Sequence, residues 1–270
     1  MWHKATNFFS SLEDKRLQDF LESYDYVWDA LDHIESFISD VIEPNVAPIR
    51  KLQGGFVPIP VAIYQGVPIT LGITYDYRDK DQRFHVFHEG KELLDASLIL
   101  PGAFLADDNI EIGGGVLVES GTMIIGPTIL GKYTTVRHSA YIRGGVFTTS
   151  NSLIGHCTEA KNVIMMDEAK AGHFAYLGDS IIGSQVNLGA GTKLANLKIT
   201  TLPYHFRVDG IDLEVKKRKF GAILGDGVAS GCNCVTNPGT LMGQNCRIMP
   251  NTTVKAGYHG PMSVISSKVF

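Results

Sequence analysis

The chain has 270 residues, 44% of them apolar, and a formal net charge of −4. This composition supports a hydrophobic core and excludes a disordered chain, and the lack of a global positive charge argues against nucleic acid as the main partner. No apolar run is long enough to span a bilayer and the N-terminus lacks a signal-peptide pattern, so we expect a cytoplasmic protein without a membrane partner. Four cysteines are too few for a disulfide scaffold. The Cys232-x-Cys234 pair lacks a second pair, so we interpret it as packing rather than as a metal site.

The first predicted element is helical and covers residues 10–42. Apolar residues recur there at steps of three and four, which predicts one amphipathic helix or two in sequence, packed on a neighbouring surface. Ser10 or Ser11 is expected to cap its start, with Glu13 nearby. Pro44 and Pro48 end the helical pattern.

Residues 55–94 change to short extended segments such as FVPIPVAIY and RFHVFH, separated by glycines and charged turns. This pattern predicts short strands. No chemistry is evident in them, so the function of residues 1–95 stays open.

After about residue 96, aliphatic residues recur every six positions, with some steps of five, and small residues often follow them. A repeat of six residues predicts a parallel β-helix in which three short strands form one triangular coil and the repeated residues point inward. The repeated positions are Val118, Leu130, Val136, Ile142, Thr148, Ile154, Ala160, Met165, Ala171, Leu177, Ile182, Leu188, Leu224, Ser230, Thr236, Met242, Ile248 and Val254.

One coil takes 18 residues, or 17 where a step is shortened, so residues at this spacing should lie above one another, about 4.8 Å apart. Three sets of polar residues have this spacing: His138, His156 and His173; Arg143 and Lys161; Tyr141, Glu159 and Tyr176. The sequence therefore predicts neighbouring columns of imidazoles, of cations, and of a carboxylate with phenols.

These columns suit a definite chemistry. Paired cations bind phosphate, a carboxylate accepts hydrogen bonds from sugar hydroxyls, and an imidazole can take a proton from an amine that attacks a thioester. Exposed positions on a β-helix are often polar for solvation alone. The coincidence of three kinds of titratable group in the same coils favours a site.

The segment IGHCTEAKNVIMMDEAKAGHFAYLGDSIIGSQVNLGAGTKLAN, residues 154–196, resembles the acetyltransferase domain of the bifunctional glucosamine-1-phosphate acetyltransferase/N-acetylglucosamine-1-phosphate uridylyltransferases, and RKFGAILGDGV resembles the wider sugar-1-phosphate nucleotidylyltransferase/acetyltransferase branch. The resemblance covers about residues 105–258. It implies a mainly-β, left-handed parallel β-helix of hexapeptide repeats that assembles as a homotrimer, here with an N-terminal helical and β extension.

The same resemblance implies an N-acetyltransferase that uses acetyl-coenzyme A (acetyl-CoA) as acyl donor. The acceptor would be an amino-sugar 1-phosphate of the glucosamine-1-phosphate kind, or a nucleotide sugar, in the synthesis of sugar nucleotides and cell-envelope precursors. No tightly bound metal is expected.

Site residues follow from the resemblance position by position. His173 would be the catalytic base on the amine, and Asn196 would orient the sugar or the acetyl group. The cofactor groove would be lined by Ala190 and Cys232. The substrate would be bound by Arg143 and Lys161 at its phosphate, by Glu159, Tyr176 and Asn187 at its sugar, and by Lys219 reaching a neighbouring subunit's ligand.

The sequence departs from the family pattern in places. No glycine-rich nucleotidylyltransferase loop occurs near the N-terminus, and Gly189-Ala-Gly191-Thr-Lys193 is better interpreted as β-helix turns. His156 replaces an asparagine common in the family, Leu197 replaces an aromatic residue, and Cys232 replaces a small residue at the cofactor. These changes bear on the acceptor more than on the type of reaction.

Residues 197–219 break the six-residue repeat, and Asp209-Gly210 between two short extended runs predicts a hairpin. The segment ends in the cations Lys216–Lys219, which suit either phosphate binding or a solvated tip. We therefore expect three parts: residues 1–95, a β-helix domain at 96–260 with an inserted loop at 197–219, and a tail at 261–270.

Two other functions use the same fold class. Three aligned histidines are also compatible with a metalloenzyme of the γ-carbonic-anhydrase type, although a column of cations would repel a metal ion. The third alternative is a non-catalytic oligomer that binds sugar phosphates.

Overall fold

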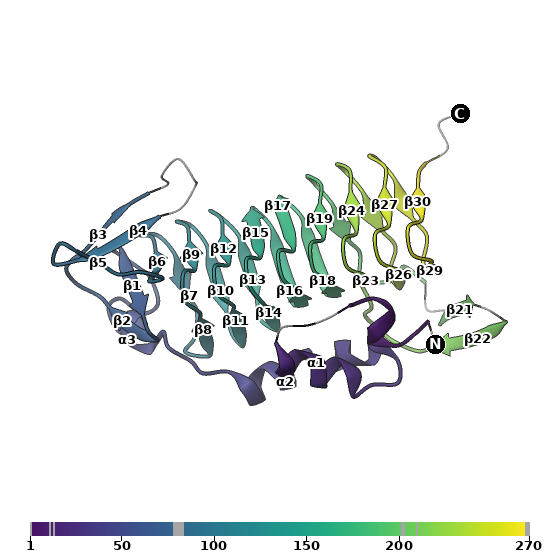
Figure 1. Cartoon of the computed structure of the whole chain (residues 1–270), viewed down its shortest axis with the longest axis horizontal. Coiled ribbons are helices and arrows are strands. Elements are labelled where there is room, and N and C mark those ends of the chain that lie inside the picture. The colour runs from purple at the N-terminus through teal and green to yellow at the C-terminus, as the bar shows by residue number, and fades with distance from the viewer. Residues whose placement is uncertain are drawn as a thin grey trace.

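The computed structural model describes residues 2–10, 12, 14–77, 84–200, 203–208 and 210–267. Most of them wind into a long parallel β-helix with three faces, and the predicted fold class is confirmed (Figure 1). The first face contains β6 Ser97–Ile99, β9 Leu117–Val118, β12 Thr135–Val136, β15 Leu153–His156, β17 Lys170–His173, β19 Asn187–Leu188, β24 Ala229–Ser230, β27 Arg247–Ile248 and β30 Val264–Ile265.

The other two faces form one continuous sheet, because β16 and β18 each pass from the second face to the third without a break. The second face contains β7 Phe104–Leu105, β10 Met123–Ile125, β13 Tyr141–Arg143, β20 Lys193–Leu194, β25 Val235–Thr236, β28 Thr253–Val254 and the first parts of β16 Glu159–Met165 and β18 Tyr176–Ile182. The third contains the rest of these two strands with β8 Ile110–Ile112, β11 Thr128–Leu130, β14 Val146–Thr148, β23 Ala222–Leu224, β26 Thr240–Met242 and β29 Gly257–His259.

The six-residue repeat forms the interior, as predicted. Val136 pairs with Ile154, Ile154 with Ala171, and Ala171 with Leu188, all of them buried. The polar members are also buried, and Thr148 Oγ1 and Thr134 Oγ1 share a hydrogen bond of 2.9 Å. The interior is therefore a stack of coils in fixed register, which places outward side chains in columns as well.

The chain begins with helices that lie along the third face (Figure 1). Their bounds are η1 Ala5–Asn7, α1 Lys15–Glu22, η2 Val27–Asp32 and α2 Ile34–Val41, where η marks a 3₁₀-helix. The short helix α3 Ala47–Arg50 lies instead at the end of the β-helix, where Ile49 joins the interior core. The predicted helical stretch is thus two α-helices separated by a 3₁₀ segment. Its apolar side packs on outward residues of the third face, among them Phe147, Ile164 and Ile181.

The predicted cap of the first helix is wrong at Ser10, while Ser11 and Glu13 lie outside the described residues. Asp14 is the N-cap and accepts hydrogen bonds from the backbone N–H groups of Arg16 and Leu17. Ser10 instead donates its N–H and its hydroxyl to Asp226, both at 2.7 Å. A local motif cannot reveal this, because Asp226 is brought near by the fold.

The strands predicted between residues 55 and 94 are present as β1 Val61–Tyr64, β2 Val67–Ile69, β3 Ile73–Asp76, β4 His85–His88 and β5 Lys91–Glu92. The strand β1 runs antiparallel to β6 and covers the edge of the first coil, and β2 pairs with β1. The other three form a separate small sheet.

The insertion leaves the β-helix after β20 and returns at β23. It forms the hairpin of β21 Tyr204–Val208 and β22 Ile211–Val215, in which Gly210 has a φ of 78° and Asp209 lies outside the described residues. At its base, Leu197 and Lys219 pair as an isolated bridge.

Close coil stacking gives a test at two glycines. A Cβ at Gly155 would overlap the backbone carbonyl of Gly172, whereas a Cβ at Gly172 would meet nothing closer than Leu153 Cδ2 at 3.8 Å. We expect Gly155→Ala to cost about 1–3 kcal/mol or more of stability, since backbone has to shift, and Gly172→Ala to change stability by less than about 0.5 kcal/mol. Calorimetric melting temperatures check this, and equal values for the two variants would contradict the stacking.

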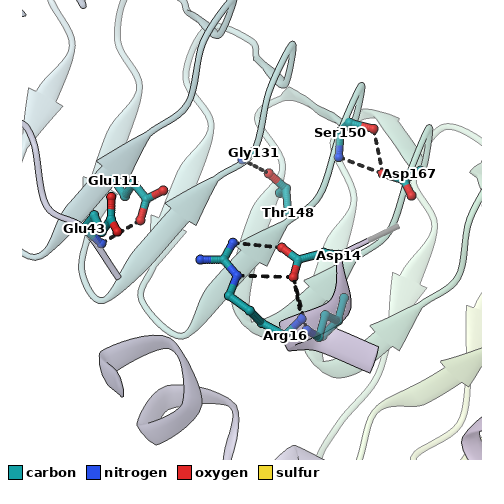
Figure 2. A network of polar contacts seen from close by, with 9 residues as sticks. Asp14, Arg16, Glu43, Glu111, Gly131, Thr148, Ser150 and Asp167 are labelled. Carbon is teal, nitrogen blue, oxygen red and sulfur yellow. Dashed lines mark hydrogen bonds and ion pairs between the residues drawn. The ribbon is translucent and has the colours of Figure 1, made fainter. Parts of the chain in front are cut away.

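Where the helices meet the third face, Glu111 is half-buried and accepts a hydrogen bond of 2.7 Å from the backbone N–H of Glu43 (Figure 2). Burial raises the pKa of Glu111, although this hydrogen bond and nearby Arg16 lower it in part. A raised pKa means that the folded state holds the proton longer than the unfolded state, so stability falls as pH rises from the ordinary value of 4.5 through the folded value.

Glu111→Gln should remove the loss of stability that accompanies ionisation of Glu111, while its amide oxygen can still accept the hydrogen bond from the Glu43 N–H. We expect the variant to be at least as stable as the parent at pH 7, with a shallower decline of unfolding free energy above pH 4.5. Denaturant titrations at several pH values measure it, and exposed Glu168→Gln is the control. A steeper decline in Glu111→Gln would show that the carboxylate stabilises the fold.

Candidate functional site

The predicted histidine column is confirmed at one corner of the β-helix. His156 pairs with His173 across β15 and β17. The rings of His138 and His156 stack with centroids 5.4 Å apart and planes 8° apart, and the ring of His173 meets His156 edge-on at 5.0 Å. His138 and His173 are exposed, so this column presents imidazole nitrogens to solvent.

The same corner continues beyond the histidines. Backbone hydrogen bonds run from Gly191 N to His173 O at 3.0 Å, from Asn233 N to Ala190 O at 2.7 Å, and from Asn251 N to Cys232 O at 2.9 Å. Ala190 and the exposed Cys232 therefore occupy the position of His173 in the next coils. The expected base and the two expected cofactor-lining residues lie along one line parallel to the axis.

At the other end of the column lies a buried carboxylate that the sequence analysis missed. Glu119 Oε2 accepts the backbone N–H of His138 at 2.9 Å and lies 3.5 Å from its Nδ1, and the Tyr77 hydroxyl donates to Oε1 at 2.5 Å. Glu119 is 19 residues before His138, one more than a coil. A search for residues 17 or 18 apart does not find it.

The second face carries the expected strip of carboxylate and phenols. Tyr141 pairs with Glu159, and Glu159 with Tyr176. Arg143 Nη1 donates to Glu159 Oε1 at 2.6 Å, and this hydrogen bond raises the pKa of the guanidinium. The cation column and the carboxylate strip are thus in direct contact.

Lys161 has a cationic neighbour in the same chain. A hydrogen bond with Lys219, followed by burial and the charge of Lys219, lowers the pKa of Lys161. Lys219 reaches this place because its bridge with Leu197 closes the base of the insertion. Two adjacent amines that repel each other as cations form a ready site for an anion.

Asn196 belongs to a further column that the sequence analysis missed. Asn162 Nδ2 donates to Asp179 Oδ1 at 3.0 Å, and Asn196 Nδ2 donates to Asp179 Oδ2. Each is 17 residues from the next, so the coil period would have revealed them. A Cβ at Gly178 would lie 2.7 Å from both Asn196 Nδ2 and Tyr176 Oη, so a side chain at this position would displace the ends of these two site residues.

Tyr176 is half-buried beside these groups. Burial raises the pKa of its phenol, and the nearby carboxylates Glu159 and Asp179 act in the same direction, while a hydrogen bond with Asn196 lowers it in part. The phenol therefore stays protonated at neutral pH and can donate a hydrogen bond to a ligand.

An open cavity of about 440 Å³ lies over this strip. Two of the expected substrate residues, Glu159 and Tyr176, line it together with Asn196 and residues from the neighbouring coils. The lining consists of Cys157, Glu159, Phe174, Ala175, Tyr176, Lys193, Ala195, Asn196, Leu197 and Val235.

Asn187 is not brought to this cavity within one chain. It begins β19 on the first face, aligned with Lys170 and Ala229, whereas Glu159 and Tyr176 lie on the second face. His173 lies at the corner between the two faces, three residues before Tyr176.

A zinc site finds no support in the geometry of one chain. Among the described residues, no three His, Cys, Asp or Glu side chains converge as metal ligands. The histidines stack along an axis instead of surrounding a point.

No helix in the described ranges has the length and apolar character needed to cross a bilayer.

The interior lattice and the outward columns define a hexapeptide-repeat β-helix protein with a polar, cation-bearing site on its second face. Comparison with known proteins agrees. The chain is 32% identical over 184 residues to a bifunctional sugar-1-phosphate nucleotidylyltransferase/acetyltransferase of Sulfurisphaera tokodaii, covering 66% of this chain and 46% of that protein. It is 36% identical over 154 residues to the bifunctional protein GlmU of Methanococcus vannielii, covering 55% and 37%.

The GlmU protein of Methanocaldococcus jannaschii is also 36% identical, over 148 residues, or 53% of this chain and 36% of that protein. The chain is therefore homologous to the bifunctional nucleotidylyltransferase/acetyltransferases, as the sequence predicted. It spans less than half the length of these relatives, and its β-helix is consistent with their acetyltransferase domain alone. No protein-family model matches.

The contact between Lys161 and Lys219 gives a test. Because the pKa of Lys161 is lowered, the parent protein should lose affinity for an anion as pH rises through that lowered value. Lys219→Met removes the neighbouring amine and lets the pKa of Lys161 return toward 10.5. We expect about tenfold weaker phosphate binding at pH 7, with the alkaline loss shifted to higher pH.

Calorimetric titration with inorganic phosphate measures both effects, and Lys255→Met on an exposed lysine at the end of the same face is the control. If Lys219→Met and Lys255→Met gave the same pH dependence as the parent, the two amines would not act together.

Proposed function

We propose that the protein is an acetyl-CoA-dependent N-acetyltransferase whose acceptor is an amino-sugar 1-phosphate of the glucosamine-1-phosphate kind or a nucleotide sugar. The observation that carries the proposal is the cavity lined by Glu159, Tyr176 and Asn196, on the strip where Arg143 meets Glu159 and where Lys219 lies close enough to Lys161 to lower its pKa. Adjacent cations suit the phosphate, and carboxylate, phenol and amide groups suit hydroxyls of the sugar.

In the proposed reaction, His173 is the general base. Its neutral imidazole takes a proton from the acceptor amine as the nitrogen attacks the thioester carbonyl of acetyl-CoA. A carbon–nitrogen bond forms and the carbon–sulfur bond breaks. The imidazolium then returns its proton to the departing thiolate, so the products are an N-acetyl sugar phosphate and free coenzyme A. Asn196 orients the acceptor or the acetyl group.

The line from His173 through Ala190 to Cys232 supports a donor site parallel to the axis. On this proposal the thioester lies at His173 and the rest of the donor extends along the following coils. The Ala190 backbone and Cys232 line that groove.

We further propose a cytoplasmic homotrimer. Asn187 lies on a different face from Glu159 and Tyr176, so it serves a site only if a neighbouring prism meets that face. In such an assembly Asn187 binds the sugar held by the adjacent subunit, and Lys219, which lies beside Lys161 of its own chain, lies at the same boundary. On this proposal the protein acts in the biosynthesis of sugar nucleotides or cell-envelope precursors.

Acetyl transfer from acetyl-CoA to a panel of amino-sugar 1-phosphates, followed by thiol release, tests the proposal. We expect turnover by the parent and a loss of about 10²–10⁴-fold in His173→Ala, the usual contribution of a positioned base. His88→Ala, in the small sheet at β4, is the matched control and should keep full activity.

Other outcomes separate the alternatives. No turnover, with a raised melting temperature on adding sugar phosphate, would indicate a non-catalytic binding protein. Stoichiometric zinc in the purified protein, without acetyl transfer, would indicate the metalloenzyme.

A further inference from the structure

The N-terminal segment η2, residues 27–32, contacts the Asn162–Asp179–Asn196 column, whose last member lines the cavity. The backbone carbonyl of Leu31 accepts a hydrogen bond of 2.9 Å from Asn162 Nδ2. The same amide nitrogen donates to Asp179 Oδ1 at 3.0 Å. One side chain of the β-helix therefore connects the N-terminal segment to the carboxylate that holds Asn196.

This carboxylate has little contact with solvent. Asp179 is 6% exposed, and its second oxygen accepts the amide of Asn196. Backbone hydrogen bonds attach the end of the insertion to the same two residues, from Phe220 N to Asn196 O at 2.9 Å and from Gly221 N to Asp179 O at 2.8 Å. Displacing Asp179 would thus move both Asn196 and the strand that follows Lys219.

A second connection runs through Lys217. Its side chain is only 7% exposed, and its Nζ forms ion pairs with Asp29, at 3.6 Å, and with Asp32. Both carboxylates belong to η2. The Trp28 ring of the same segment packs on the ring of Phe220 with centroids 6.3 Å apart. The residues on either side of Lys219 are therefore fixed against η2 by charge and by packing.

We propose that η2 is a positioning element of the acceptor site: it holds Asn196 through Asn162 and Asp179, and it holds Lys219 next to Lys161 through Lys217. The inference rests on the proposed function for its kinetic consequence, but its geometric part stands on these contacts alone. It gives the N-terminal region a role in substrate affinity. The segment touches no substrate and acts through the residues that do.

The test replaces Lys217 by methionine, which keeps much of the side-chain volume and removes the charge. The matched control is Lys216→Met, since Lys216 is 81% exposed and forms an ion pair within its own segment, with Glu214 at 3.0 Å. We expect Lys217→Met to raise the KM for the amino-sugar phosphate about tenfold, the effect of a small misplacement of binding groups, and to leave the KM for acetyl-CoA unchanged. Lys217→Arg should restore most of the affinity.

A second readout does not depend on activity. Hydrogen exchange of the amides of Phe220 and Gly221 should accelerate in Lys217→Met and stay slow in Lys216→Met. The pair Asp29→Asn and Asp32→Asn removes the same ion pairs from the other side and should reproduce both effects if Lys217→Met folds poorly.

The outcomes are distinct. Equal exchange in Lys217→Met and Lys216→Met would overturn the positioning role. Faster exchange with an unchanged KM for the sugar phosphate would show that η2 holds the insertion without serving the acceptor, which also overturns it. A parent protein without acetyl transfer would refute the proposed function, while the exchange measurement would still decide whether η2 fixes residues 217–221.

Discussion

The hydrogen-bond ladder between parallel coils is the constraint on which the rest of this structure depends. Each coil pairs with the next in a register fixed by the buried lattice, so Ile154 lies between Val136 and Ala171 and cannot shift without turning interior residues outward. Once that register is set, it also fixes which outward side chains are neighbours. The stacked imidazoles and the strip from Tyr141 to Tyr176 are consequences of core packing, which makes the β-helix a rigid support for a site.

The faces of this support are used unequally. Helices α1 and α2 bury the apolar side chains of the third face, such as Phe147 and Ile164, and so make it part of a second core. The second face stays polar and holds the cavity, and the corner beside it holds the histidines. Covering one face also brings η2 into contact with the insertion, through Lys217 and Phe220. The packing of the N-terminal helices on the third face therefore affects the positions of Asn196 and Lys219 at the site.

The sequence predicted the contacts that follow from the coil period. It missed the contacts between residues that are far apart in the chain and are brought together by the tertiary fold. Counting coils located the histidine column and placed the cation column beside the column of Glu159 and the phenols, because both results follow from the lattice alone. The same coil spacing also relates Asn162, Asp179 and Asn196, and a search that included amide side chains along with imidazoles and cations would have found this column. The place of Lys219 beside Lys161 depends on where an irregular loop returns, and the bond of Ser10 to Asp226 joins residues 216 apart. No local sequence pattern predicts such long-range contacts.

The antiparallel strand β1 has a consequence for self-association. A parallel β-helix ends in an open edge of backbone donors and acceptors, onto which a second molecule could add in the same direction and start a fibre. Here β1 and then β2 cover the edge of β6 with reversed polarity, and Pro68 in β2 lacks an N–H to offer. At this end the first face therefore closes with an antiparallel pair, onto which a second β-helix cannot add a coil in the parallel direction.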